Sequence, residues 1–115
     1  MTEALTVSTP VFTTDILSAD DFTKKHTPYI EIEELEGAAH VTVKLGYYVA
    51  HPNKPGHFFD RIELSCNGAP VAFFSGTPQT VESQFSTVLN VEPGSELVAI
   101  AHCNLHGSFA AKTTV

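Results

Sequence analysis

The sequence has no tryptophan, a single methionine and only two cysteines among its 115 residues. Two cysteines are too few for the disulfide-dense scaffold of a small secreted domain, so we expect Cys66 and Cys103 to be free thiols or metal ligands. Without tryptophan, the Cys…Trp…Cys pattern of a true immunoglobulin domain is absent. The only methionine is Met1, which argues against a blue-copper site with an axial thioether ligand.

Long apolar runs and basic residues are also scarce. No apolar run approaches the roughly 18 residues that a membrane-spanning helix needs. Thirteen acids against six bases give a formal net charge of −7, which opposes binding to nucleic acid or to anionic lipid. The first residues lack the basic and apolar regions of a secretory signal. We therefore expect a cytoplasmic protein that binds neither nucleic acid nor a membrane.

The length suits one domain with one hydrophobic core. Residues 1–21 carry short apolar islands among Thr, Ser and Asp, and we interpret them as an N-terminal arm that leads into a domain over residues 22–115. Where the arm meets the domain, residues 18–22 have the composition of one helical turn, with Ser18 as the N-cap.

Short alternating or β-branched segments, separated by turn residues, predict an all-β fold. Turn signals such as Asn67-Gly68 and Pro93-Gly94 separate them. The expected strands are residues 29–35, 40–50, 58–65, 71–74, 81–89, 97–102 and 108–115. This pattern predicts a seven-stranded immunoglobulin-like β-sandwich without a long helix.

Four of the six histidines lie in three short clusters at expected strand ends or in loops. The clusters are Lys24-Lys25-His26-Thr27-Pro28, His51-Pro52-Asn53-Lys54-Pro55-Gly56-His57 and Cys103-Asn104-Leu105-His106-Gly107. A rigid β scaffold commonly presents functional side chains at such positions. By contrast, His40 and His102 lie on expected strands and are interpreted as ordinary polar residues, and Cys66 as a structural thiol.

The chemistry of these donors narrows the choice of metal. Five nitrogen and sulfur donors exceed the four that structural zinc prefers. Several imidazoles with one thiolate suit a five-coordinate iron with one open face, and an anionic sulfur favours chemistry on a bound oxygen species. A non-catalytic β-sandwich that holds zinc or iron remains an alternative, as does a plain interaction module without metal.

Taken together, the motifs Lys-His-x-Pro, His-Pro-x4-His and Cys-Asn-x-His-Gly resemble those of the superoxide reductase family, which includes neelaredoxin and the iron-binding domain of desulfoferrodoxin. The resemblance covers residues 22–115. It implies a mononuclear non-haem iron with an axial thiolate and four equatorial imidazoles. By position in the motifs, the ligands would be His26, His51, His57, Cys103 and His106.

The same resemblance implies an activity and partners. The ferrous ion would reduce superoxide to hydrogen peroxide, and Lys25 matches the family's lysine beside the open coordination site. The cysteine-rich N-terminal module of the two-iron relatives is absent, so the chain resembles the one-iron type. Electrons would then come from a rubredoxin-like or other small external donor. A homodimer or homotetramer is expected.

One position departs from the family pattern. The family commonly has Glu-Lys-His, in which the glutamate is the sixth ligand of the oxidised iron, whereas this chain has Lys24 in that place. A lysine is not an anionic oxygen ligand. The sequence therefore leaves two possibilities, a water or hydroxide ligand or a nearby acid such as Asp20 or Asp21.

The distribution of positive charge supports an anionic substrate independently. Four of the six basic residues lie within four positions of a proposed ligand; these four, the basic collar, are Lys24, Lys25, Lys54 and Arg61. A local positive field on an acidic protein can direct a small anion to one site. We therefore expect the collar to attract superoxide to the metal.

Overall fold

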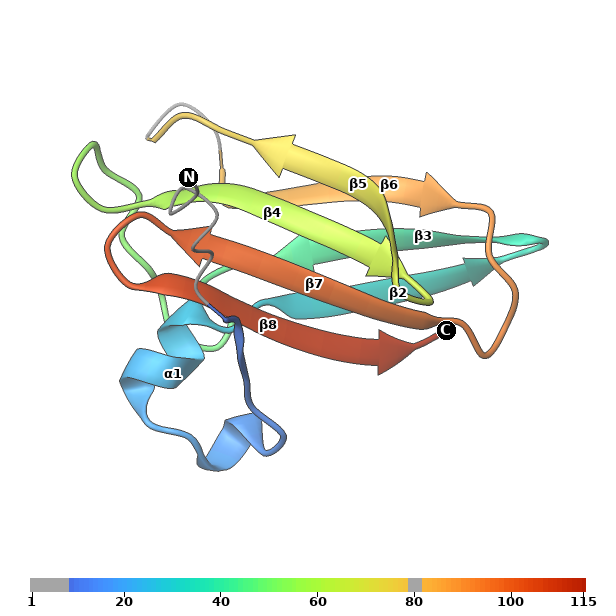
Figure 1. Cartoon of the computed structure of the whole chain (residues 1–115), viewed down its shortest axis with the longest axis horizontal. Coiled ribbons are helices and arrows are strands. Elements are labelled where there is room, and N and C mark those ends of the chain that lie inside the picture. Colours follow the sequence, from blue (N-terminus) through green and yellow to red (C-terminus); the bar gives the residue numbers. More distant parts are fainter. Residues whose placement is uncertain (1–8, 79–81) are drawn as a thin grey trace, which may run out of the picture.

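The computed structural model describes residues 9–78 and 82–115, which form a β-sandwich of two sheets (Figure 1). One sheet has the strand order β1-β8-β7-β4-β5 and the other the order β2-β3-β6. All neighbouring strands are antiparallel except β1 and β8. The strands are β1 (Val11–Phe12), β2 (Tyr29–Leu35), β3 (Ala38–Lys44), β4 (Phe59–Cys66), β5 (Ala69–Ser75), β6 (Gln84–Leu89), β7 (Glu96–Cys103) and β8 (Gly107–Thr114).

The predicted all-β sandwich is confirmed, and each of the seven expected strands has a counterpart. The eighth strand, β1, has only two residues. The expected strand over residues 40–50 is wrong in its second half, because β3 ends at Lys44. Gly46 follows with φ +69, a left-handed conformation that breaks an extended strand. Residue 81, where another strand was expected to begin, lies outside the described residues.

Strand β7 shows how sequence alternation positions the core. Leu97, Ala99, Ala101 and Cys103 are all fully buried, while the residues between them are only partly buried. Successive side chains of a strand point to opposite faces, so this alternation turns every second residue of β7 toward the other sheet. Cys103 is therefore the last core-facing residue of a central strand, and its backbone lies at the end of the sandwich.

The short helix α1 (Asp21–His26) begins later than the sequence indicated. The prediction of a turn at residues 18–22 capped by Ser18 is wrong, because Ser18 ends the 3-10 turn η2 (Ile16–Ser18). The N-cap is Asp20, whose carboxylate accepts a hydrogen bond of 2.9 Å from the backbone N–H of Thr23. At the other end, Pro28 disfavours the helical conformation of Thr27, so the helix stops at His26.

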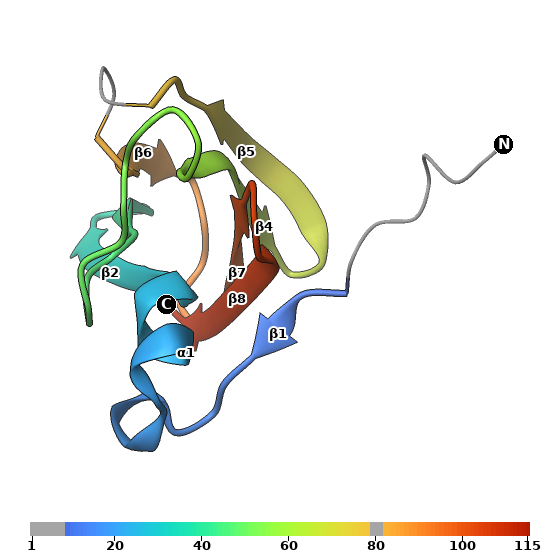
Figure 2. The ribbon, with the colours of Figure 1, turned by 90° about the vertical axis from the view of Figure 1, so that its left-hand side faces the viewer.

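Three segments meet at one end of the sandwich. Helix α1, the β3–β4 loop over residues 45–58 and the β7–β8 turn lie together on the left of Figure 1, and this end faces the viewer in Figure 2. These segments carry the three histidine clusters. None of the helices in the described part of the chain has the length and apolar character that crossing a bilayer requires.

Candidate metal centre

The three segments bring four imidazole rings around a common centre. Neighbouring rings in the order His26, His51, His57 and His106 have centroids 4.7 to 5.2 Å apart and are inclined by 73 to 84°. The diagonal pair, His26 and His57, is 6.4 Å apart with the rings inclined by only 29°. The rings therefore stand edge-on around a four-sided space, as four imidazoles do when each directs one nitrogen to the same point.

Cys103 adds a sulfur donor to this ring of imidazoles. Its Sγ atom lies 3.5 Å from Nε2 of His51 and 3.9 Å from Nδ1 of His106. Nδ1 of His106 in turn lies 3.2 Å from Nε2 of His26. One ligand atom each from His26, His57, Cys103 and His106 lies within 4.8 Å of the others. The structure thus brings together all five side chains that the sequence motifs singled out.

Burial differs across the centre. Cys103 is completely buried and His26 is 1% exposed, whereas His106 is exposed and His57 is partly exposed. The ring of His26 stacks on Phe109 at 4.7 Å, and the ring of His51 lies 4.1 Å from Phe59. The thiol therefore lies on the side of the protein core, and two of the four imidazoles, those of His57 and His106, reach the surface.

Two backbone carbonyls determine which nitrogens of His26 and His51 keep a lone pair for a metal. Nδ1–H of His26 donates to the carbonyl of Phe22, and Nδ1–H of His51 donates to the carbonyl of Pro52, both at 2.7 Å. In each neutral ring the lone pair is then on Nε2, the atom that faces the cluster. Metal-binding histidines commonly use this arrangement, in which the second ring nitrogen is held by a carbonyl.

An unpaired buried atom at the same place supports a metal. Nε2 of His57 is buried and has no hydrogen-bond partner, although buried polar atoms are normally paired. A cation at the centre of the four rings would use this lone pair. Neutral imidazoles and one thiolate are a donor set that suits iron, so the residues present fit the iron that the motifs imply.

Burial and neighbouring charges keep three of these histidines neutral. Burial lowers the pKa of His51 from 6.5 to about 4, despite the opposing effect of its bond to Pro52. Burial is also the largest cause that lowers the pKa of His26 and of His57. The positive charge of Lys25 acts in the same direction on all three rings. Neutral imidazole is the form that binds a metal.

Asn104 joins the two loops of the site, a role that the sequence motifs did not reveal. Its side-chain oxygen accepts from the backbone N–H of Phe58 at 2.9 Å, and its amide donates to the carbonyl of Gly56 at 3.1 Å. Its own backbone N–H donates to the carbonyl of Phe58. These bonds tie the residues before and after His57 to the residue that follows Cys103. The signal in the sequence that could have indicated this role is the position of an asparagine between two proposed ligands.

Two glycines allow the loops to reach the site. Gly46 has φ +69, and a Cβ atom there would lie 3.1 Å from the backbone nitrogen of His51. Gly107 has φ +87 directly after His106. Both conformations strain any residue with a side chain, so these glycines position His51 and His106.

The other singled-out residues lie outside the cluster. His102 hydrogen-bonds Asp60 at 2.7 Å, and His40 lies 3.8 Å from Glu33. Cys66 is buried at the opposite end of β4. The carboxylate of Asp20 caps α1, and its hydrogen bonds with Thr23 lower its pKa.

The metal-free protein is expected to lose stability as the pH falls from about 6.5 to about 4. In this range His51 of the unfolded chain takes up a proton, whereas in the fold its pKa is about 4. The unfolded chain then binds more protons, so stability rises with pH, and His26 and His57 add to the effect in the same direction. Denaturant unfolding across this range should show a loss of about 2 kcal/mol. The variant His51→Gln should flatten the profile, and a stability that is constant or rises on acidification would contradict this account.

The desulfoferrodoxin family model matches residues 18–112 of this chain. Among curated proteins, the superoxide reductase of Pyrococcus abyssi is 31% identical over 101 residues, which cover 80% of this chain and 88% of that protein. The superoxide reductase of Thermococcus kodakarensis is 29% identical over 109 residues, which cover 87% of this chain and 95% of that protein.

Solved structures give the same result. The superoxide reductase (neelaredoxin) from Ignicoccus hospitalis matches with a TM-score of 0.77 and 25% identity, over 92% of this chain and 93% of that one. The superoxide reductase from Nanoarchaeum equitans matches with a TM-score of 0.72 and 27% identity, over 79% of this chain and 93% of that one. The likeness therefore extends over most of the sandwich.

Proposed function

This chain belongs to the desulfoferrodoxin family, and from this premise we propose that its five converging side chains hold the iron at which it reduces superoxide. The chain is a superoxide reductase, and its cofactor is a mononuclear non-haem iron. The proposed ligands are His26, His51, His57, Cys103 and His106. The observation that carries this assignment is the ring of four imidazoles beside the buried Cys103 sulfur.

The family favours this function over the alternative of a non-catalytic zinc or iron sandwich. The matched family model and the matched relatives are superoxide reductases or desulfoferrodoxins over most of the chain. In the reaction, superoxide takes up one electron and two protons and becomes hydrogen peroxide, and no dioxygen is formed. When bound, the iron supplies the electron and a Lewis-acidic site for the oxygen substrate.

The chain's own residues supply charge, protons and shielding. Lys25 directly precedes the proposed ligand His26 in α1, and its charge acts on three of the four rings. Its ammonium group attracts superoxide and stabilises negative charge on oxygen as it develops. It also provides a proton to the reduced substrate, directly or through water. The carbonyls of Phe22 and Pro52 keep the protons of His26 and His51 on the atoms that face away from the metal.

Lys24 is assigned no role as a ligand. It lies in the last turn of α1 beside Lys25, and an ammonium group provides no lone pair at neutral pH. Because Asp20 is used as the helix cap, we propose that water, hydroxide or Asp21, and not Asp20, would take the place where the family has its glutamate.

Partners, assembly and domain limits are proposals of the same kind. A small rubredoxin-like protein or another external donor would re-reduce the iron, since the reaction needs one electron per superoxide. A homodimer or homotetramer, a cytoplasmic location and the division into an arm (1–21) and a domain (22–115) stay predictions.

Superoxide consumption by the iron-loaded, reduced protein tests the function. After a pulse of radiolytically generated superoxide, we expect one hydrogen peroxide per superoxide, oxidation of one iron, and no dioxygen. The same protein loaded with zinc should leave superoxide to its spontaneous decay. Equal yields of hydrogen peroxide and dioxygen would indicate dismutation, and they would overturn the assignment. So would a purified protein that is colourless after oxidation and holds zinc tightly.

A further inference from the structure

A second candidate site lies away from the metal ligands, under the N-terminal segment. A cavity of about 470 Å³ lies between residues 12–16, residues 27–28 before β2, Tyr48 of the β3–β4 loop and residues 111–112 of β8. We call it the arm pocket, and it is lined by Phe12, Thr14, Thr27, Tyr48 and Lys112 among others. Its volume is in the range of sites that bind small organic molecules. None of the proposed metal ligands lines it.

The walls of the arm pocket combine flat apolar surfaces with hydroxyl groups. The rings of Phe12 and Tyr48 and the side chains of Ile16 and Pro28 form the apolar part. Thr13 and Thr14 belong to the same lining, and their hydroxyl groups form no hydrogen bond within residues 9–78 and 82–115. Apolar walls with a few polar groups are typical of sites that bind and orient a small ligand.

Tyr48 is held in place by other tyrosines. The rings of Tyr29 and Tyr47 stack at 4.0 Å with an interplanar angle of 8°. The ring of Tyr48 stands edge-on to both, at 5.9 Å from Tyr29 and 5.2 Å from Tyr47. A smaller cavity of about 170 Å³ extends the lining from Tyr48 to Tyr29. The aromatic wall is therefore preorganised, which lowers the entropic cost of binding a flat molecule.

The charge of the lining selects for an anion. Among the residues that the structure describes, Lys112 is the only charged one on the wall of the arm pocket, although the chain has 13 acids and six bases. Its ammonium group forms no ion pair with an acid within residues 9–78 and 82–115. A cation without a neighbouring acid, beside an apolar wall, attracts a negatively charged ligand group.

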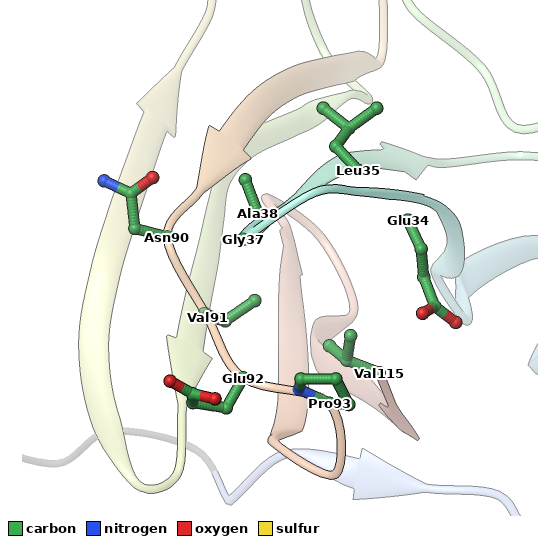
Figure 3. Close-up of a pocket in the computed structure, with 9 residues that line it drawn as sticks. All are labelled: Glu34, Leu35, Gly37, Ala38, Asn90, Val91, Glu92, Pro93 and Val115. Atoms are coloured by element: carbon green, nitrogen blue, oxygen red, sulfur yellow. The ribbon is translucent and has the colours of Figure 1, made fainter.

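Another cavity of the molecule has the opposite character. The cavity in Figure 3 has a volume of about 220 Å³, and its lining includes the carboxylate side chains of Glu34 and Glu92 and no basic side chain. An organic anion would be repelled there. The two cavities therefore predict different ligands, and the second provides an internal comparison.

From these observations we propose that the arm pocket binds a small organic anion with a flat apolar body, such as an aromatic carboxylate or sulfonate. The body would lie against Phe12 and Tyr48, and the anionic group would pair with Lys112. The pocket also borders the metal centre along the chain, since Thr27 and Pro28 on its lining directly follow His26. Binding does not depend on the proposed iron chemistry, so zinc-loaded protein should bind as well as iron-loaded protein.

A fluorescence titration with anilinonaphthalene sulfonate tests the proposal on the metal-loaded full chain. We expect saturable binding at one site, and we expect Lys112→Glu to weaken it about tenfold or more. The uncharged analogue phenylnaphthylamine should bind more weakly to the unaltered chain and should not respond to Lys112→Glu. Lys54→Glu makes the same charge change elsewhere and should leave the affinity unchanged. Ala111→Phe, which adds a ring to the lining, should block both probes.

Several results would overturn the proposal. They are no saturable binding, equal weakening by Lys54→Glu, or equal binding of the charged and uncharged probes. Self-association of the chain through the pocket would also overturn the proposal. In that case the unaltered chain would not bind the probe, and Ala111→Phe would change the oligomeric state seen in sedimentation. Circular dichroism of each variant verifies the fold, and Lys112→Gln replaces Lys112→Glu if the latter does not fold.

Discussion

Replacing Cys103 by serine is expected to abolish the visible absorption band of the oxidised iron-loaded protein and to lower its rate with superoxide by at least about a hundredfold. A thiolate ligand donates electron density to iron and gives rise to charge-transfer absorption, whereas a serine hydroxyl does neither. Cys103 is completely buried with its sulfur 3.5 Å from Nε2 of His51. Its loss therefore removes the only sulfur at the centre of the described imidazoles.

The matched control is Cys66→Ser, the other thiol of the chain. Cys66 is buried at the far end of β4, whereas Cys103 pairs with Phe59 at its near end. We expect Cys66→Ser to keep both the band and the rate. Circular dichroism and the metal content of both variants separate a lost ligand from a lost fold. A band that survives in Cys103→Ser, or that disappears only in Cys66→Ser, would contradict the assignment of the sulfur ligand.

Replacing Lys25 by alanine is expected to slow superoxide consumption by about tenfold or more while the iron content and the absorption band stay the same. The Lys25 charge lowers the pKa of His26, His51 and His57 together with burial, so its field extends over the centre. Removing it lowers both the attraction of the anion and the stabilisation of charge on its oxygen atoms. Lys25→Arg keeps the charge and should retain most of the attraction.

The neighbouring Lys24 provides the control. It also lies in the last turn of α1, but its charge is not among the causes that lower the pKa values of the ring histidines. Lys24→Ala should therefore change the rate much less than Lys25→Ala. The rate of the unaltered protein should fall as salt is added, and this dependence should be weaker in Lys25→Ala. Full activity of Lys25→Ala, or equal effects of the two variants, would remove Lys25 from the mechanism.

The strands were predictable because their signals are local. Alternation and turn residues mark β2 and β7 in the sequence, and both are found within one residue of the expected limits. The expected strand over residues 40–50 failed after Lys44, since β-branched and aromatic residues also occur in loops. There the left-handed Gly46 and the approach of its backbone to His51 decided the outcome. Local composition did not contain that contact.

The start of helix α1 shows a second limit of prediction from the sequence alone. Ser18 and Asp20 are both acceptable N-cap residues, and the sequence alone favoured the wrong one. In the fold the backbone N–H of Thr23 meets the carboxylate of Asp20, and Ser18 belongs to a separate turn. The segment before the helix is fixed by the pairing of Val11 and Phe12 with β8, which no pattern within this segment specifies.

By itself the sequence determined that this chain is an all-β domain with an unusual set of histidines and one cysteine in motifs, because strand alternation and ligand spacing are properties of neighbouring residues. Only the tertiary structure decided that α1, the β3–β4 loop and the β7–β8 turn meet at one end, that Asn104 joins two of them, and that Lys112 faces an apolar pocket without an acid. Those arrangements arise from contacts between residues far apart in the chain. The energies of these contacts depend on how the two sheets pack against each other, and the order of residues along the chain does not show that packing directly.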